Sequence, residues 1–294
     1  MTLATDELAV ALDAKCELGE SPVWDPVGSC LYFVDILRGS VHRFDPVTRS
    51  SQTYQVGGMV GAVALTETGD LILAVRDGFA RLNPNGGLVT PVANVDADRP
   101  DLRMNDGGCD PAGRFWAGTM ALDERPGAGT LYRLDPDGRV HAMVRGVGIS
   151  NGLDWTDDGR RMYFIDSLAR SVDVFDFDLE SGAIDNRRQL IRIPPDQGAP
   201  DGLTVDAEGG LWVALWGGGA VHRFTADGVL DRVIRLPTDY PTSCAFGGAN
   251  LTDLYITTAA VELSERERAI QRGAGALFCC RPGPCGRRPH RFRG

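Results

Sequence analysis

The sequence predicts an all-β fold, a six-bladed β-propeller with four-stranded blades, and three observations support this prediction. One sequence pattern recurs six times along the 294 residues. Each copy holds two short runs of alternating apolar residues around a turn, and a second strand-like element follows. The copies begin at Glu20, Gly61, Asn105, Asn151, Asp201 and Thr242. Successive starts lie 41 to 50 residues apart, which is typical of propeller blades.

Each copy is expected to open with a β-hairpin. Eight residues after every start stands a glycine or an asparagine, a residue that tolerates the positive φ of a tight turn. These residues are Gly28, Gly69, Gly113, Gly159, Gly209 and Asn250. Asp25, Asp110 and Asp206 stand three residues before their glycines, where a carboxylate can bond turn amides. Apolar alternation on both sides of the turn indicates two strands.

The second element of each copy predicts two further strands. TLYRLDPDG, for example, is a short strand that enters an Asp-Pro-Asp-Gly turn, and the β-rich stretch VHAMV follows it. A β-sandwich is the alternative, but its strands do not repeat so regularly. The stretch from Leu8 to Cys16 is expected to pair with the last blade and close the ring, which removes exposed edges. The charged segment from Glu262 to Arg272 predicts a short helix on a loop. The whole chain, 1–294, is expected to form one domain.

Composition limits the classes of function. The formal net charge of −10 argues against nucleic-acid binding, which requires basic surfaces. Met1 to Val10 lacks the features of a signal peptide, and there is no apolar run of about 20 residues, so we expect a cytoplasmic protein without membrane contact. The seven scattered cysteines suggest free thiols. Nothing in the pattern indicates an oligomeric state.

The repeat also predicts a site. The first strand of a blade lines the channel, so the six starting residues should lie at one height near one mouth. Five of them are polar. Strand entry alone favours Asn and Asp as turn residues, but a matched ring of them indicates more. Glu20 and Asp201 offer carboxylates and Asn151 an amide oxygen, a set that suits Ca²⁺, Mg²⁺ or Mn²⁺. Zn²⁺ also accepts carboxylates, but usually together with nitrogen or sulfur.

Other residues bear on this site. Asp35 and Asp166, fifteen residues after their starts, should return to the same mouth, where they could orient the ligands or bond loop amides. The four histidines lie away from the starting positions, and neither HExxH nor GxSxG occurs. A histidine-based zinc hydrolase and a Ser-His-Asp triad are therefore poorly supported.

Five ordered blocks resemble the senescence marker protein (regucalcin) and gluconolactonase family: GESPVW, RMNDGGCDPAGRFWAGTM, ISNGLDWTDDGRRMYFIDS, PDGLTVDAEGGLWVALWGGG and CAFGG. The resemblance extends from about Cys16 to the C-terminal RFRG. It implies a six-bladed propeller with one divalent metal, bound by Glu20 of GESP, Asn151 of SNGL and Asp201 of PDG. The tail, with PGPCGRRP, departs from the family pattern, and we expect its basic run at the surface.

The resemblance also implies substrate contacts. Arg103 and Asn105 of RMND match the family's substrate-binding residues. The acidic contact in the loop after GTM falls on Asp123, where family members often have glutamate, or on the neighbouring Glu124.

The implied activity is metal-dependent hydrolysis of a small sugar (aldono-) lactone to the aldonic acid, a carboxylic-ester hydrolase reaction of sugar metabolism. Ca²⁺ is the first expectation for the metal, with Mn²⁺, Mg²⁺ and Zn²⁺ as alternatives. Asp201 is the first choice for the general base, and Asp123 or Glu124 is the second. A phosphotriester hydrolase of the same fold and a non-enzymatic calcium-binding regulator are the alternative functions. Gluconolactone and its close relatives differ too little for the sequence to select one.

Overall fold

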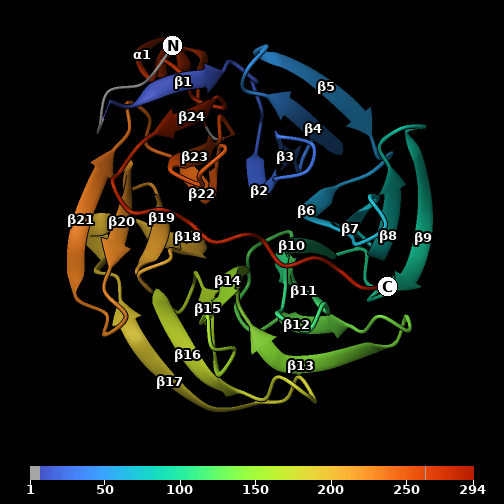
Figure 1. Ribbon diagram of the computed structural model, residues 1–294. Helices are drawn as coiled ribbons and strands as arrows, with labels where there is room; N and C mark the ends of the chain where they lie inside the picture. The colour runs from blue at the N-terminus through green and yellow to red at the C-terminus, as the bar shows by residue number, and fades with distance from the viewer. Residues whose placement is uncertain (1–6, 262) are drawn as a thin grey trace.

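A computed structural model, which describes residues 7–261 and 263–294, confirms the propeller (Figure 1). Six antiparallel four-stranded sheets surround a central channel. The first strand of each sheet packs against the first strands of both neighbouring sheets, so these six strands line the channel. No helix among the described residues is long and apolar enough to cross a membrane.

The blades follow one another along the chain, with the following bounds. Blade 1 contains β2 (Gly19–Asp25), β3 (Cys30–Asp35), β4 (Ser40–Asp45) and β5 (Ser50–Gln55). Blade 2 contains β6 (Val60–Leu65), β7 (Leu71–Val75), β8 (Gly78–Asn83) and β9 (Leu88–Asn94). Blade 3 contains β10 (Leu102–Cys109), β11 (Phe115–Ala121), β12 (Gly129–Leu134) and β13 (Val140–Val147). Blade 4 contains β14 (Ser150–Trp155), β15 (Arg161–Asp166), β16 (Ser171–Phe177) and β17 (Ile184–Arg192). The 3₁₀ turn η1 (Pro195–Gln197) leads to blade 5, which contains β18 (Ala199–Val205), β19 (Leu211–Trp216), β20 (Ala220–Phe224) and β21 (Leu230–Arg235).

Blade 6 closes the ring with strands from both ends of the chain. It contains β22 (Pro241–Gly247), β23 (Asp253–Thr258), β24 (Leu277–Cys280) and, as its outer strand, β1 (Ala9–Leu12). This confirms the predicted role of the N-terminal strand. The short helix α1 (Glu265–Ile270) lies between β23 and β24, and a capping box starts it. Glu262, at the start of the predicted helix, and residues 1–6, part of the segment judged to lack a signal peptide, lie outside the described residues.

The core is divided among the blades. Six buried apolar clusters each fill the space between two neighbouring blades. Successive side chains of a strand point to opposite faces of its blade, and each face packs against one of the two neighbouring blades. Only the outer strands of the blades are largely exposed. All seven cysteines are free thiols, as expected.

The hairpin turns confirm most of the turn prediction. Asp25, Asp110 and Asp206 each accept hydrogen bonds from two amides of their own turn. Four of the predicted glycines have positive φ, from 63° to 90°. In blades 1 and 6 the positive φ falls one residue later than predicted, at Ser29 and Leu251.

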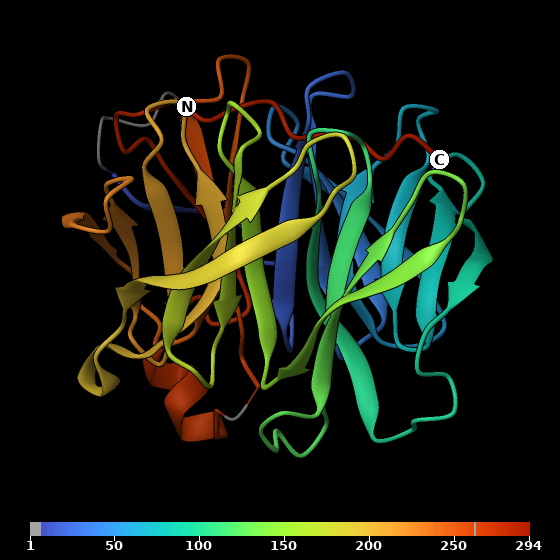
Figure 2. The ribbon, with the colours of Figure 1, turned by 90° about the horizontal axis from the view of Figure 1, so that it is seen from below.

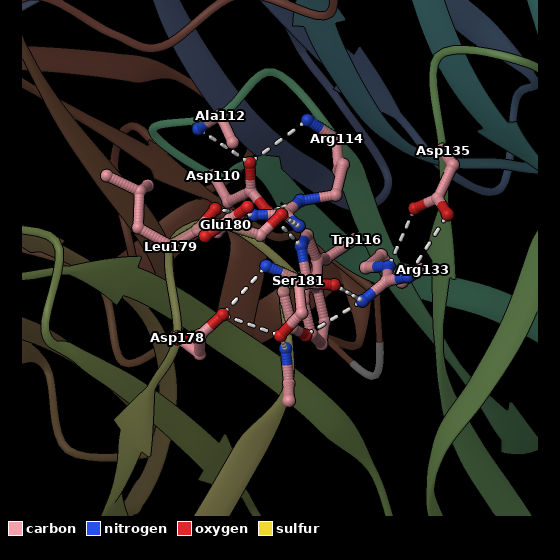
Figure 3. Close-up of polar contacts among 12 residues, drawn as sticks. Asp110, Ala112, Arg114, Trp116, Arg133, Asp135, Asp178, Leu179, Glu180 and Ser181 are labelled. Atoms are coloured by element: carbon pink, nitrogen blue, oxygen red, sulfur yellow. Dashed lines mark hydrogen bonds and ion pairs between the residues drawn. The ribbon is translucent and has the colours of Figure 1, made fainter.

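Blades 3 and 4 are joined by a pair of arginines (Figure 3). Arg114 is oriented by Asp110 (Nε to Oδ2, 2.6 Å) and donates to the carbonyl of Leu179, 2.7 Å away, in the turn between β16 and β17. Arg133 donates to the carbonyl of Gly182 in the same turn at 2.8 Å. A Cβ on Gly182 would lie within 2.5 Å of both guanidinium groups. Only glycine therefore leaves room for this contact.

The C-terminal tail, residues 281–294, crosses the face opposite helix α1 (Figures 1 and 2). It bonds the inner hairpins of all six blades. The bonds are Gly286 N to Leu251 O, Ala207 N to Cys285 O, Arg287 Nη2 to Trp155 O, Arg293 N to Gly113 O, Phe292 N to Leu65 O and Arg291 Nη2 to Asp25 Oδ1. The basic run lies at the surface, as expected, with Arg288 and Arg293 exposed, but it also takes part in joining the blades. The arginines of the tail find carbonyl and carboxylate partners that only the assembled ring presents.

Truncating Phe292 to alanine should destabilise the protein by about 3–5 kcal/mol, because its ring is 2% exposed in the cluster between blades 2 and 3. Thermal unfolding should detect a fall of several degrees in Tm. Leu88→Ala is the matched control, since Leu88 is 64% exposed on an outer strand. Equal, small changes in both variants would show that the tail contributes little to closing the ring.

Candidate functional site

The site lies where the inner strands leave regular pairing. In every blade the register between first and second strand shifts at the predicted starting position, for example between Glu20 and Val23 and between Met104 and Gly107. Such bulges redirect side chains and are common beside active sites. Because all six lie at the same end of their strands, they form a ring on the face that carries helix α1 (Figure 2).

The three predicted metal ligands are brought together in this ring. Glu20, Asn151 and Asp201 are all buried, with 4–6% of their surface exposed. Burial raises the pKa of the Glu20 carboxyl well above its usual range, and the charges of Asp201 and Asp106 raise it further. Burial and the charge of Asp106 likewise raise the pKa of Asp201, against opposing effects of Arg103 and Asn151. The carboxylates are therefore close enough to repel one another.

Asp106 is a member of the site that the sequence reasoning missed. Burial raises its pKa to about 6, although the backbone amide of Gly107 donates to it at 2.7 Å. Strict alternation would point Asn105 and Asp106 to opposite sides of β10. Both lie inside the bulge between Met104 and Gly107, so the alternation does not apply. The signal that could have found Asp106 is the unbroken polar pair Asn-Asp at a channel position.

The raised pKa of Asp106 predicts that the metal-free protein loses folding stability as the pH rises. The pKa of Asp106 is about 6 in the folded protein, against the usual 3.8 expected in the unfolded chain. Its contribution to folding stability is therefore fully present below pH 3.8 and is lost as the pH rises through about 6. Asp106→Asn, which does not ionise, should thus gain stability relative to the wild type between pH 4 and 7.5. About 1–3 kcal/mol is expected at 1.36 kcal/mol per pKa unit. Metal-free unfolding curves of both proteins at the two pH values provide the measurement, and a constant difference would contradict it.

Arg103 and Asn105 form a connected group with Asn151. Arg103 Nη1 donates to Asn105 Oδ1 at 2.6 Å, and Asn105 Nδ2 donates to Asn151 Oδ1 at 3.1 Å. Burial lowers the pKa of Arg103 to about 10, while the charges of Glu20, Asp201 and Glu124 oppose this shift. Arg103 is thus the cation that faces the buried carboxylates. The amide of Asn105 is already occupied by protein partners.

The loop after GTM separates the two acidic candidates. Asp123 is exposed and pairs with Arg125 (2.8 Å between Oδ1 and Nη1). Glu124 is also exposed, but its charge acts on Arg103. Of the two, Glu124 therefore lies in the better place to complement the site.

Asp35 and Asp166 bind the loops that precede two of the strands carrying predicted metal ligands. Asp35 accepts from the amides of Glu17 and Leu18, and Asp166 accepts from those of Gly148 and Ile149. They bond loop amides, the second of the two roles considered for them. These loops lead directly into β2 and β14, which carry Glu20 and Asn151.

The donor chemistry fits a hard divalent cation. Three buried carboxylates share the site with one buried arginine, which leaves negative charge that a dication would balance. Within the described residues, no group of three or more His, Cys, Asp or Glu side chains is arranged so that it could hold a metal by itself. The predicted set contains two carboxylates and takes its third oxygen from an asparagine. The set therefore stays a prediction.

A cavity of about 130 Å³ lies on the other side of the ring, towards the tail. Asp106, Ser21 and Ser243 line it from the inner strands, and Arg287 and His290 line it from the tail. The tail thus covers the channel on the face opposite the predicted ligands.

Comparisons with known proteins agree with this architecture. The family model described as SMP-30/Gluconolactonase/LRE-like region matches residues 18–260. Regucalcin of Xenopus laevis is 42% identical over 268 residues, which cover 89% of this chain and 90% of that protein. A calcium-binding protein, regucalcin, from Agrobacterium tumefaciens superimposes with a TM-score of 0.94 at 28% identity, covering 99% of this chain and 100% of that chain. Luciferin-regenerating enzyme superimposes with a TM-score of 0.92 at 30% identity, covering 98% and 99%.

Proposed function

Because the chain belongs to the SMP-30/gluconolactonase/LRE-like family, we propose that it is a divalent-metal-dependent hydrolase that opens a sugar lactone to the aldonic acid. The observation that carries the proposal is the buried cluster of Glu20, Asp106 and Asp201 at one end of the channel, where the charges of Glu20 and Asp201 act on the buried Arg103. Burying three carboxylates beside a single arginine is costly, so such a cluster indicates a function rather than a contribution to stability.

Glu20, Asn151 and Asp201 would hold the cation through their oxygens. The chemistry that a dication would supply there is that of a Lewis acid, which would polarise the lactone carbonyl and stabilise the negative charge that develops on its oxygen. Glu20 and Asp201 together carry the two negative charges that balance a dication, and Asn151 adds a neutral oxygen ligand. Ca²⁺ remains the first expectation, in keeping with the calcium-binding relative from Agrobacterium tumefaciens.

Asp201 is the proposed general base. Its carboxylate takes a proton from the water that attacks the carbonyl carbon, and returns it to the ring oxygen as the carbon–oxygen bond breaks. The product is the open-chain hydroxy acid.

Arg103 and Glu124 supply the polar surroundings that a sugar lactone needs. The Arg103 guanidinium carries several hydrogen-bond donors. Glu124, at the mouth of the channel, is an acceptor whose charge acts on Arg103. A lactone with several hydroxyl groups can use both. An organophosphate with apolar substituents would gain less from such a lining, which makes phosphotriester hydrolysis the weaker alternative.

The first experiment is a panel of aldonolactones, with ring opening followed by proton release. Metal-stripped protein is compared with protein given Ca²⁺, Mn²⁺, Mg²⁺ or Zn²⁺, and a phosphotriester is included as a competing substrate. Turnover of one lactone that returns with metal supports the proposal. Turnover of the phosphotriester alone would replace it with the alternative hydrolase.

A calcium-binding regulator without catalysis is the second candidate. The similarity to proteins named regucalcin favours it, because one of them is described as calcium-binding. Calcium binding by calorimetry, together with no turnover of any lactone, would support this function instead.

A further inference from the structure

Each predicted metal ligand follows a peptide carbonyl that is held by a side chain from the preceding blade. Thr242 Oγ1 of blade 6 donates to the carbonyl of Gly19, which precedes Glu20 in blade 1. Asn105 Nδ2 of blade 3 donates to the carbonyl of Ser150, before Asn151, at 2.8 Å.

The third ligand has the same arrangement. Ser167 Oγ of blade 4 donates to the carbonyl of Pro200, before Asp201, at 2.6 Å. The same hydroxyl accepts from Asn151 Nδ2 at 2.8 Å. One serine therefore connects the side chain of one ligand to the backbone of the next.

The pattern is confined to the ligand positions. Gly61 and Thr242 are the starting residues of blades 2 and 6, and neither is a predicted ligand. Among the residues that the structure describes, the carbonyls before them, those of Val60 and Pro241, accept no hydrogen bond from a side chain of the neighbouring blade. Asn105 is the third starting residue outside the ligand set, and the Met104 carbonyl before it accepts from Arg103 of its own blade. If these hydrogen bonds served only to join neighbouring blades, they would be expected at all six junctions between blades.

We propose that Thr242, Asn105 and Ser167 are positioning residues that fix the spacing of Glu20, Asn151 and Asp201 around the metal. The inference rests on the metal centre proposed above. The peptide group is planar, so holding its carbonyl also fixes the plane that ends at the Cα of the ligand residue. In a bulged strand, where regular pairing is interrupted, this side-chain bond takes over the task of orienting the ligand.

The orientation of Asn151 follows from the same set. Its Nδ2 donates to Ser167, and its Oδ1 accepts from Asn105. The amide is therefore held with its oxygen, the atom that can bind a cation, on the side of Asn105. Without Ser167, the amide nitrogen would lose this acceptor, and the contact with Asn105 alone would hold the orientation of the amide.

The test measures Ca²⁺ affinity by calorimetry on the full chain. Thr242→Val removes the hydroxyl at nearly constant volume, and Thr242→Ser keeps it. We expect affinity to fall by about 10- to 100-fold in the valine variant, the usual effect of losing an outer partner of a metal ligand. The serine variant should stay within about threefold of the wild type. Ser167→Ala is an independent second variant with the same expected loss.

Thr66→Val is the matched control. Thr66 is also buried and donates to a carbonyl, that of Asp70 at 2.9 Å, but in a hairpin turn at the other end of the channel. Both valine variants should lower the Tm of the metal-free protein, whereas only Thr242→Val should weaken Ca²⁺ binding.

The outcomes separate this inference from the function on which it rests. If Glu20→Gln weakens binding while Thr242→Val and Ser167→Ala do not, the positioning role is overturned and the metal centre stands. If the wild type does not bind Ca²⁺, or Glu20→Gln leaves binding unchanged, the metal centre and the positioning role are both overturned.

Discussion

Asp201→Asn is expected to lower kcat on the lactone substrate by about 100- to 10,000-fold, the usual contribution of a positioned general base. Asparagine keeps an oxygen that can bind the cation, as Asn151 is proposed to do, but it cannot take a proton from water. Binding should therefore survive better than turnover. Steady-state kinetics at saturating metal, with metal content checked on the same sample, measures the two effects separately.

Asp227→Asn provides the control for this substitution. Asp227 is exposed in the outer turn of the same blade, so its loss should leave kcat unchanged. Full activity of Asp201→Asn with metal bound would remove Asp201 from the role of base. Glu124, whose charge reaches Arg103, would then be the next residue to replace.

Glu20→Gln should reduce divalent-metal affinity by more than about 100-fold, because losing even an outer partner of a ligand costs about 10- to 100-fold. Wild-type protein should lose activity on chelation and recover it with added metal. Binding should also raise the Tm, since a ligand at 100 times its Kd stabilises the folded state by about 2.7 kcal/mol. Glu265→Gln, on the exposed helix α1 of the same face, should behave as the wild type.

The metal affinity should also rise with pH. Burial and the neighbouring carboxylates raise the pKa values of Glu20 and Asp201 in the metal-free protein, so these carboxyls keep their protons to a higher pH than usual and the cation competes with those protons. Calorimetry at pH 6 and pH 8 should show tighter binding at the higher value, with proton release on binding. An affinity independent of pH would indicate that these carboxyls are not the ligands.

Sequence reasoning found the blades and the predicted ligands through the same repeat. A fixed period places equivalent residues at equivalent heights, so Glu20, Asn151 and Asp201 could be grouped without knowing any distance. Asp106 escaped because period-two alternation assigns it to the other side of β10, and only the bulge brings it to the channel. A bulge depends on the partner strand as well as on the local sequence, so alternation along a single strand does not reveal it.

The sequence by itself determined the six blades, the closing N-terminal strand and the ring of polar starting residues, because these depend on periodicity and local turn chemistry. Only the tertiary structure decided the course of the tail, the place of Asp106 and the bonds made by Ser167 and Thr242. Thr242 lies 223 residues from Gly19, yet donates to its carbonyl. Such pairings follow from ring closure, which sets residues side by side irrespective of their separation along the chain.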